Sequence, residues 1–521
     1  MQSSSHTVHA ATRSADRRRL LVSSTAALSF ALILAGCNVG PNFLSPKPPE
    51  VARFTTGVMP DQTASSPAPT GDAQRFLSGA DVPARWWSVF GSPEIDRRIA
   101  IALEHNPSVT SAQAALRQAQ ENLNAAAGGQ FPQVSGALGA TRQKSSLAGI
   151  GIENSQAPSP IYTLYNASVS VSYTIDLFGS IRRQVEAQAA LADVSQAELD
   201  ATYQTLIANV VTASIQEASL RAQIGATRDI VTAFERQLEL IQAQQNFGAR
   251  SMADVLQARS QLAAQRALLP PLQQRLEQTG NQLATYLGRL PAEADLAPVQ
   301  LDGLTLPPDI PVSLPSTVVA NRPDIRAADA QLHQATAQVG VATANRLPNI
   351  VLSGSLGSQA TSMNDIFGAG SGIWTLGLNL AQPIFQGGTL TARQRAAEAA
   401  LQKAVADYRV TVLTAFQDVA NALRALVIDA ETLRAQAAYE LAAADSLRLV
   451  RSQYDAGAIN ILSVLDAERQ TLQSRIALIQ ARAARLQDTA ALYAALGGGW
   501  QDAAALAPPL PPRRDRPWLA Q

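Results

Sequence analysis

The feature that most constrains the fold of this chain is an internal duplication. Asn106-Pro107 opens a segment that runs to Phe131-Pro132, and Arg322-Pro323 opens a second that runs to Leu347-Pro348 at the same spacing. A later stretch of the first half also aligns without a gap on the second half. Its matching residues include Gly248/Gly457, Ala249/Ala458, Val255/Val464, Leu256/Leu465, Arg266/Arg475, Leu287/Leu496 and Gly288/Gly497. A period of about 210 residues is far longer than the roughly 20–50 residues of a solenoid repeat, so two similar halves are expected.

The N-terminus has the pattern of a secretory signal. Arg17, Arg18 and Arg19 precede a short apolar run, 20–34, and small residues follow it. This order of basic, apolar and small residues is typical of a signal peptide. The alternative is a membrane anchor, but the run falls short of the roughly 20 residues that a bilayer-spanning helix needs.

Cys37 is the only cysteine among the 521 residues. An internal disulfide and a zinc cluster are therefore excluded. Leu34-Ala35-Gly36-Cys37 resembles the bacterial lipobox, in which the cysteine is lipidated and becomes the new N-terminus. We expect a covalent lipid on Cys37 and no other cofactor. Asn38 is not the aspartate that resembles an inner-membrane retention signal, which favours the outer membrane.

Composition narrows the remaining choices. Lys and Arg together number 41, as do Asp and Glu, so no basic surface argues for nucleic acid. The Pro/Ser/Thr-rich lead from Pro41 to Pro69 predicts an extended, partly disordered tether. After residue 37 no apolar run approaches 18 residues. A protein tied to the outer membrane then either lies on it or crosses it as a barrel.

Four segments alternate between apolar and small polar residues, at 133–141, 167–175, 349–357 and 374–381. A half-buried sheet of a soluble domain would show the same alternation. The alternative is a transmembrane barrel, with apolar side chains facing lipid and serines facing water. The lipoprotein signal and the small polar face favour the barrel. Because even the smallest barrels have about eight strands, four strands require other copies of the chain.

Helical patterns surround each predicted hairpin. Segments 107–129 and 323–346 carry Pro in the first turn and end before an X-Pro pair. After each hairpin comes a Pro-free stretch of 68 residues, 180–247 or 388–455, which as a helix would extend roughly 100 Å. Heptad-like apolar spacing within these stretches predicts coiled-coil contacts at Leu199, Tyr203, Leu206 and Val210, and at Leu413, Phe416, Val419 and Leu423.

Each long helix is expected to reverse at a glycine, Gly248 or Gly457, and to return as a shorter helix. Pro270-Pro271 predicts a kink in the first return helix that the second half lacks. The expected organisation, in chain order, is a lipoprotein signal peptide over 1–36, a periplasmic lead with a short helix over 37–100, a first repeat over 101–288 (hairpin about 133–176, helical hairpin 180–288), an equatorial linker over 289–321, a second repeat over 322–497 (hairpin about 349–385, helical hairpin 388–497) and a Pro-rich tail over 498–521.

Several short motifs, in their order and spacing, resemble the outer-membrane factor (TolC-like) family, and most closely its NodT/OprM-like lipoprotein branch. They are Leu34-Ala35-Gly36-Cys37 with Gly40-Pro41, Trp86-Trp87, Leu314-Pro315-Ser316, Asn321-Arg322-Pro323-Asp324-Ile325 and Leu496-Gly497-Gly498-Gly499-Trp500. The resemblance implies a mixed α/β membrane protein. Three chains with four strands each would share one 12-stranded transmembrane β-barrel, and their helices would form an α-helical barrel tunnel. It also implies two partners beside the other copies and the outer-membrane lipid: a periplasmic adaptor (membrane fusion) protein and an inner-membrane pump of the resistance-nodulation-division (RND) class.

The resemblance also implies site residues at the two helical tips. Leu462 and Asp466 match the positions that ring the closed periplasmic aperture in OprM-like members. Three leucines would make a dry constriction, and three carboxylates would repel one another. An arginine often present where Asp455 stands is missing, which makes this mouth more acidic. The candidate adaptor contacts are Gly248, Ala249, Gly457 and Ala458. The alternatives are a solvated position for Asp466, ordinary packing for Leu462 and simple turn geometry for the glycines.

Other functional classes fit less well. After signal removal only His105 and His333 remain, without a partnered nucleophile or metal spacing, so no enzyme is expected. A non-conducting coiled-coil lipoprotein would not need hairpins with a serine face. Within the conduit class, type I protein secretion is the alternative to drug efflux, and the lipid anchor and Gly-Gly-Gly-Trp ending resemble efflux members. The sequence therefore favours an outer-membrane channel for small molecules.

Overall fold

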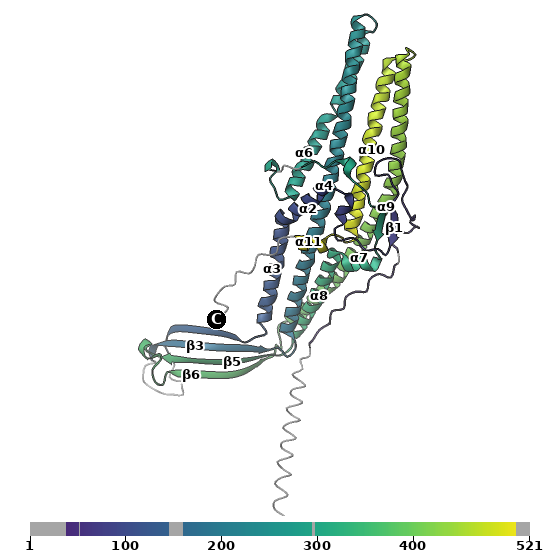
Figure 1. Ribbon diagram of the computed structural model, residues 1–521. Helices are drawn as coiled ribbons and strands as arrows, with labels where there is room; N and C mark the ends of the chain where they lie inside the picture. Colours follow the sequence, from purple (N-terminus) through teal and green to yellow (C-terminus); the bar gives the residue numbers. More distant parts are fainter. Residues whose placement is uncertain (1–37, 52, 145–159, 294–296, 507–521) are drawn as a thin grey trace, which may run out of the picture. The chain divides into compact units, whose positions relative to one another are not determined.

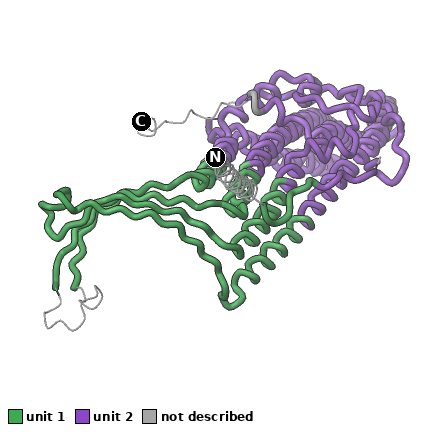
Figure 2. The backbone as a smooth tube through the Cα atoms, turned by 90° about the horizontal axis from the view of Figure 1, so that it is seen from below, with its two compact units in different colours: residues 1–45, 118–192, 330–405 green, residues 46–117, 193–329, 406–521 purple. Residues whose placement is uncertain are grey.

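The computed structural model describes residues 38–51, 53–144, 160–293 and 297–506. The predicted signal peptide, Cys37, most of the first hairpin linker and the end of the Pro-rich tail lie outside the described residues. The chain divides into two compact units (Figure 2). Unit 1 comprises 1–45, 118–192 and 330–405, and unit 2 comprises 46–117, 193–329 and 406–521. Each unit combines segments from both halves of the sequence, so the compact units do not follow the repeats.

The sheet of unit 1 contains one hairpin from each half of the sequence. Its strands are β2 (Gln133–Lys144), β3 (Ile161–Ile175), β5 (Asn349–Ala360) and β6 (Gly372–Ala381). They lie in the order β2-β3-β5-β6 and every pair is antiparallel (Figure 1). The four alternating segments of the sequence fall within these strands, which confirms the strand predictions. A short 3-10 turn, η5 (Met363–Asp365), lies in the second hairpin loop.

The helices that flank the hairpins begin and end where prolines allow. α3 (Pro107–Gly128) and α8 (Pro323–Ala344) both start at a proline and stop before the next X-Pro pair. The long helices α4 (Ser180–Asn246) and α9 (Thr389–Asp455) have 67 residues each. Among the described helices, α9 is the one with a stretch long and apolar enough to cross a membrane, and about a third of that stretch is buried in the protein.

The two return helices differ as the proline pair predicted. α10 (Ile461–Ala495) is continuous, whereas its counterpart is divided into α5 (Met252–Arg266) and α6 (Leu269–Tyr286). Pro270 and Pro271 lie in the first turn of α6, where the missing N–H groups are tolerated. The expected kink is therefore a full interruption of the helix at Ala267-Leu268.

The main core of unit 2 brings together motifs that are far apart in sequence. Trp86 and Trp87, in the 3-10 turn η1 (Trp86–Phe90), are fully buried near α2 (Pro93–His105). The ring of Trp86 stacks on that of Tyr493 at 5.6 Å. A Cβ on Gly499 would lie 2.6 Å from the Trp86 ring nitrogen, so only glycine fits there. The Trp-Trp and Gly-Gly-Gly motifs thus form one contact.

The duplication reappears as two equivalent junctions in unit 2. The side chain of Asn106 donates to the Tyr286 carbonyl oxygen, and that of Arg322 donates to the Ala495 carbonyl oxygen, at 2.8 and 2.9 Å. Gly288 and Gly497 follow these carbonyls, with φ angles of 67° and 86°. In each half the residue before the proline therefore ties the start of one helix to the end of the return helix.

The N-terminal lead, predicted over 37–100, pairs with the linker between the two repeats. β1 (Arg75–Ser78) lies parallel to β4 (Asp309–Val312), and the linker adds η3 (Pro291–Glu293), η4 (Leu301–Gly303) and α7 (Pro315–Asn321). The final helix, α11 (Trp500–Leu506), is joined to α7 by a bond from the Trp500 indole to the Asn321 carbonyl. The expectation of a partly disordered tether is wrong for Thr63, which is buried and paired with Gln74.

Candidate functional site

The polar face of the sheet carries a row of hydroxyl groups. Ser135, Ser170, Ser355 and Thr375 are direct neighbours across all four strands. The hydroxyls of Ser135 and Ser170 are 2.9 Å apart, and those of Ser355 and Thr375 are 2.7 Å apart. Small hydroxyl side chains leave room for water and carry no charge. This face suits contact with an aqueous passage.

The opposite face of the sheet is apolar and exposed. Across the register it carries Val169, Leu356 and Trp374 side by side, and Trp374 is 75 % exposed. A soluble sheet usually buries its apolar face against a core. No such cover lies over this face among the described residues. An exposed apolar face opposite a serine-rich face is the pattern of a barrel wall in lipid.

The sheet has two unpaired edges. β2 and β6 each pair with one strand only, within the described part of the chain. Free edges offer unpaired backbone N–H and C=O groups, which cannot remain unpaired in a hydrocarbon layer. Strands from other chains are therefore needed if this sheet lies in a membrane.

The residues just after Cys37 are fixed in unit 1. The buried Arg183 donates to the Val39 carbonyl oxygen and to the Asn42 side chain, the latter at 2.7 Å. Phe43 stacks on His333 at 4.3 Å, and His333 lies 3.0 Å from a Glu186 oxygen. Burial raises the pKa of Glu186, but hydrogen bonds from Arg183 and His333 outweigh it, so the net shift is downward. His333 thus has a structural partner.

Both helical tips contain the same glycine turn. Gly248 and Gly457 have φ angles of 76° and 74°. In each turn the following alanine N–H bonds to a carbonyl five residues earlier, and the glycine N–H bonds to a carbonyl three residues earlier, at 2.8–2.9 Å. This pair of bonds is the Schellman motif, which requires a left-handed residue. Gly248 and Gly457 therefore serve as the left-handed residues of the two turns. Contact of these glycines and of Ala249 and Ala458 with an adaptor stays a prediction.

A contact that the sequence did not indicate joins the two tips. The guanidinium of Arg250 donates to the Tyr454 hydroxyl at 3.3 Å and lies 5.6 Å from the ring centre. Arg250 also donates to Gln244 in its own hairpin. Neither Arg250 nor Tyr454 has a periodic or motif signal, so only the fold pairs them.

The predicted aperture residues lie one turn apart on α10. The side chain of Leu462 is 40 % exposed, while its neighbour Ile461 is buried. Asp466 accepts a hydrogen bond from Arg469 at 2.7 Å and one from Gln470 at 3.0 Å. Leu462 and Asp466 therefore share an exposed helix face. Their role at an aperture stays a prediction. The sequence motif does not indicate that Arg469 pairs with Asp466.

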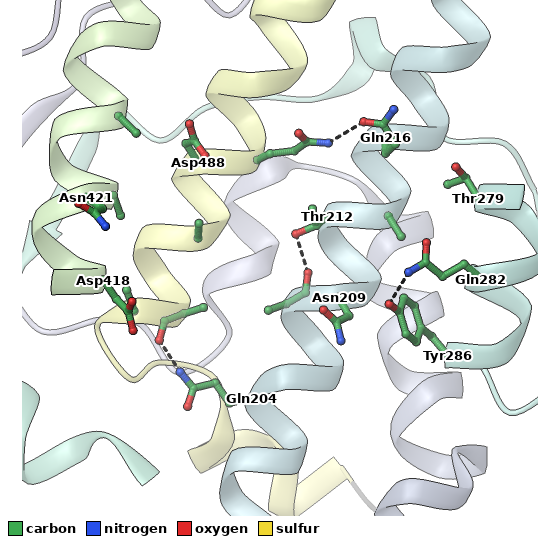
Figure 3. Close-up of a pocket in the computed structure, with 18 of the residues that line it drawn as sticks. Gln204, Asn209, Thr212, Gln216, Thr279, Gln282, Tyr286, Asp418, Asn421 and Asp488 are labelled. Carbon is green, nitrogen blue, oxygen red and sulfur yellow. Dashed lines mark hydrogen bonds between the residues drawn. The ribbon is translucent and has the colours of Figure 1, made fainter. Parts of the chain in front are cut away.

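A polar hollow of about 850 Å³ lies in unit 2 between α4, α6, α9 and α10 (Figure 3). We call it the amide hollow, because Gln204, Asn209, Gln216, Gln282, Asn421 and Gln487 line it together with Thr212, Tyr286, Arg322, Asp418 and Asp488. Gln487 donates to Gln216 at 3.1 Å across the wall. The other side of α4 is apolar and buried at Leu206 and Val210. α4 thus turns its polar side to the hollow.

Two carboxyl groups meet at the wall of this hollow. Asp488 lines it, and the carboxyl of Asp429 on α9 is close enough to that of Asp488 for the two groups to interact. Burial and the carboxyl of Asp488 raise the pKa of Asp429 to about 7, against the opposing charge of Arg485. Two carboxylates this close repel each other, which favours a proton on Asp429 in mild acid. Among the described residues no group of three His, Cys, Asp or Glu forms a metal site.

The nearest cation to this pair, Arg485, is hydrogen-bonded to the lead. It is fully buried, and it donates to the carbonyl oxygens of Thr70 and Asp72 and to the side chains of Thr63 and Gln74. Burial lowers the pKa of Arg485, and the charges of Asp429 and Asp72 act against that shift. We call the four lead residues that bond to Arg485, which are Thr63, Thr70, Asp72 and Gln74, its collar. No local sequence pattern predicts these contacts.

Comparison with known proteins places this geometry in context. Residues 99–289 and 314–498 match the family described as outer membrane efflux protein. The pyoverdine export outer membrane protein OpmQ of Pseudomonas putida is 33 % identical over 91 % of this chain and 97 % of its own length. The probable outer membrane lipoprotein SilC of Salmonella typhimurium is 27 % identical over 91 % of this chain and 98 % of its own. These matches span both halves of the sequence.

Solved structures show the same fold. The outer-membrane channel OprN has a TM-score of 0.79 and 29 % identity, covering 89 % of this chain and 100 % of that one. The open-state MtrE outer membrane channel of Neisseria gonorrhoeae has a TM-score of 0.76 and 29 % identity, covering 89 % and 99 %. Both share the mostly helical architecture with a small sheet.

Proposed function

Because the chain belongs to the outer membrane efflux protein family, we propose that it forms the trimeric exit duct of a tripartite RND-type efflux system. It is an outer-membrane channel component of an efflux system. The observation that carries the proposal is the open sheet with a hydroxyl face and an exposed apolar face. Such a sheet becomes stable in a membrane only when its free edges are paired.

Three copies satisfy the edges most simply. Four strands from each chain give a closed barrel of 12, with the serine face inward and Trp374 toward lipid. A lipid on Cys37 would anchor the chain close to the segment that Arg183 and His333 hold. The apolar surface left exposed on α9, at Val410 and Leu413, would be covered by a neighbouring chain.

The helical hairpins would form the periplasmic tunnel and its closed end. In this proposal Leu462 and Asp466 surround the aperture, and the turns at Gly248-Ala249 and Gly457-Ala458 contact a periplasmic adaptor. The exposure of Leu462 and Asp466 on one helix face supports the first role. The identical glycine turns support the second, because they offer two equal docking points in each chain.

The cargo is proposed to be small molecules. Relatives are named for small cargo: pyoverdine for OpmQ, and toluene for the efflux pump outer membrane proteins TtgC and TtgF of Pseudomonas putida. A passage lined by serines and amides discriminates weakly between such compounds, so we propose that the pump selects the cargo. The efflux description of the family favours this cargo over secreted proteins.

The test is the mass, symmetry and conductance of the detergent-extracted full-length protein. We expect a three-fold symmetric particle that carries current in a planar bilayer, with fatty acid attached to Cys37. A Cys37→Ser variant should lose the label, which identifies the lipidated residue. A monomer that carries no current would overturn the proposal.

A further inference from the structure

The amide hollow contains one pair of groups whose role the channel fold does not explain. Asp429 and Asp488 come from different helices, α9 and α10. Asp488 lines the hollow, and the carboxyl of Asp429, which is not part of the lining, interacts with that of Asp488. One oxygen of Asp429 is buried and meets no hydrogen-bond donor among the described residues. A buried carboxylate without donors is destabilised, so a packing role alone does not account for the pair.

The nearest cation, Arg485, is largely committed elsewhere. Both of its terminal nitrogens donate to the lead, at 2.7–3.2 Å. Its remaining nitrogen, Nε, is buried and meets no acceptor within the described ranges. Arg485 therefore reduces the negative potential at Asp429 without forming a hydrogen-bonded ion pair with it.

The other charges at the hollow leave its wall acidic. Arg322 bonds to both Asp324 and Asp418, at 2.7 and 3.1 Å, so this cation faces two carboxylates. The remaining lining residues that come from α4 and α6 are uncharged amides, hydroxyls and small side chains. No lysine belongs to the lining, as far as the described residues go.

We propose that the Asp429–Asp488 pair sets the preference of the conduit for cations and makes that preference depend on pH. The inference rests on the proposed function, because the hollow must face the passage of the assembled channel. It assigns a specificity role to the wall of unit 2, about six helical turns along α10 from the predicted aperture residue Asp466.

The physical reason is the charge that the pair gains near neutrality. Because the pKa of Asp429 is raised to about 7, the pair holds one proton in mild acid and releases it in mild alkali. Three copies would then add three negative charges at the level of Asp488, on or next to the lining of the wall. A water-filled passage with an acidic wall concentrates cations and excludes anions.

The experiment measures reversal potentials of the full-length channel in a KCl gradient. For the wild type, the ratio of potassium to chloride permeability should rise severalfold, roughly sevenfold, between about pH 5.5 and pH 8, since a change of order kT in the local potential enriches potassium and depletes chloride by about e-fold each. The double variant Asp429→Asn/Asp488→Asn keeps the shape of both side chains but cannot titrate. Its ratio should stay flat and low over the same pH range.

Asp302→Asn is the matched control. Asp302 is an exposed carboxylate that lines a different hollow and pairs with Arg482. This variant should retain the pH dependence of the wild type. A conducting wild type with a flat profile would overturn the inference, as would a double variant that behaves like the wild type. If the wild type carried no current, the proposed channel function itself would fail, and the two failures are thus distinguishable.

Discussion

At the scale of single residues, the most informative side chains are those that a sequence pattern does not predict. Arg485 bonds to residues of the lead more than 400 positions away. Arg250 and Tyr454 join separate hairpins, and Asp429 and Asp488 join separate helices. Periodicity reports which face of a helix is apolar, but it does not report which helix lies beside it. These contacts therefore needed the structure.

Arg485→Met should destabilise unit 2. The buried carbonyl groups of Thr70 and Asp72 would lose their donors, and Asp429 would lose the nearby positive charge. We expect the free energy of unfolding to fall by about 2–4 kcal/mol. Thermal melting of the purified protein measures this. Arg475→Met is the control. Arg475 lies on the same helix but is exposed, and its one ion pair in the described part of the chain, with Asp229, is long at 4.0 Å. Equal effects of the two variants would contradict the role of the collar.

Asp429→Asn should change how stability depends on pH. In the unfolded chain this carboxyl titrates near 3.8, whereas in the folded protein its pKa is raised to about 7. Between these values the folded protein holds a proton that the unfolded chain has lost, so the free energy of unfolding falls as pH rises. The melting temperature of the variant should therefore decrease less than that of the wild type between about pH 5 and pH 8.

Asp445→Asn provides the comparison for that measurement. Asp445 lies on the same helix, is exposed and pairs with Arg448. Its replacement should leave the pH dependence of the melting temperature unchanged. A variant Asp429→Asn that follows the wild-type curve would show that this carboxyl is not protonated in the folded protein.

At the scale of elements, the sequence predicted the strands and the long helices well. Alternating residues determined the four strands, and prolines and glycines determined where helices begin and end. The lead was predicted poorly, because a Pro- and Ser-rich composition does not reveal that Thr63 is buried beside Gln74 and Arg485. The heptad pattern also gave an incomplete picture, since Val419 and Leu423 are buried but Leu413 is 71 % exposed.

The end of α10 gives a prediction at this scale. Asp466 accepts bonds from Arg469 and Gln470 on its own helix, and Leu462 lies one turn before it. If this face lines the aperture, Asp466→Ala should raise the resting conductance of reconstituted channels, because three carboxylate side chains that narrow the passage would be replaced by small methyl groups. Glu239→Ala, an exposed carboxylate near the end of α4, is a control for general loss of a carboxylate near a tip. Unchanged conductance of Asp466→Ala would remove this residue from the gate.

At the scale of the whole molecule, exposed apolar surface indicates how the chain assembles. α9 exposes Val410, Leu413, Ile428, Leu441 and Leu449, and the sheet leaves two edges unpaired among the described residues. A single chain in water would not keep such surface uncovered. In the proposed trimer, assembly with identical chains would cover the helix and would also pair the strand edges.

Leu413→Glu should weaken that assembly without disturbing the fold of the chain. Leu413 is 71 % exposed in the single chain, so its replacement removes little internal packing, but it would place a charge in the contact between copies. The mass of the detergent-extracted particle should shift from three chains toward one. Gln417→Glu is the comparison variant. It lies one turn further along the same exposed surface and adds the same charge, but at a position that is already polar. A trimeric Leu413→Glu protein would place this stripe outside the interface.

The serines and threonine that neighbour one another across β2, β3, β5 and β6 have a consequence for traffic through the outer membrane. Repeated by three-fold symmetry, they would form an uncharged ring that both donates and accepts hydrogen bonds. Such a ring is readily hydrated but binds neither anions nor cations strongly. Exported compounds would therefore not be retained at the last part of the passage before they leave the cell.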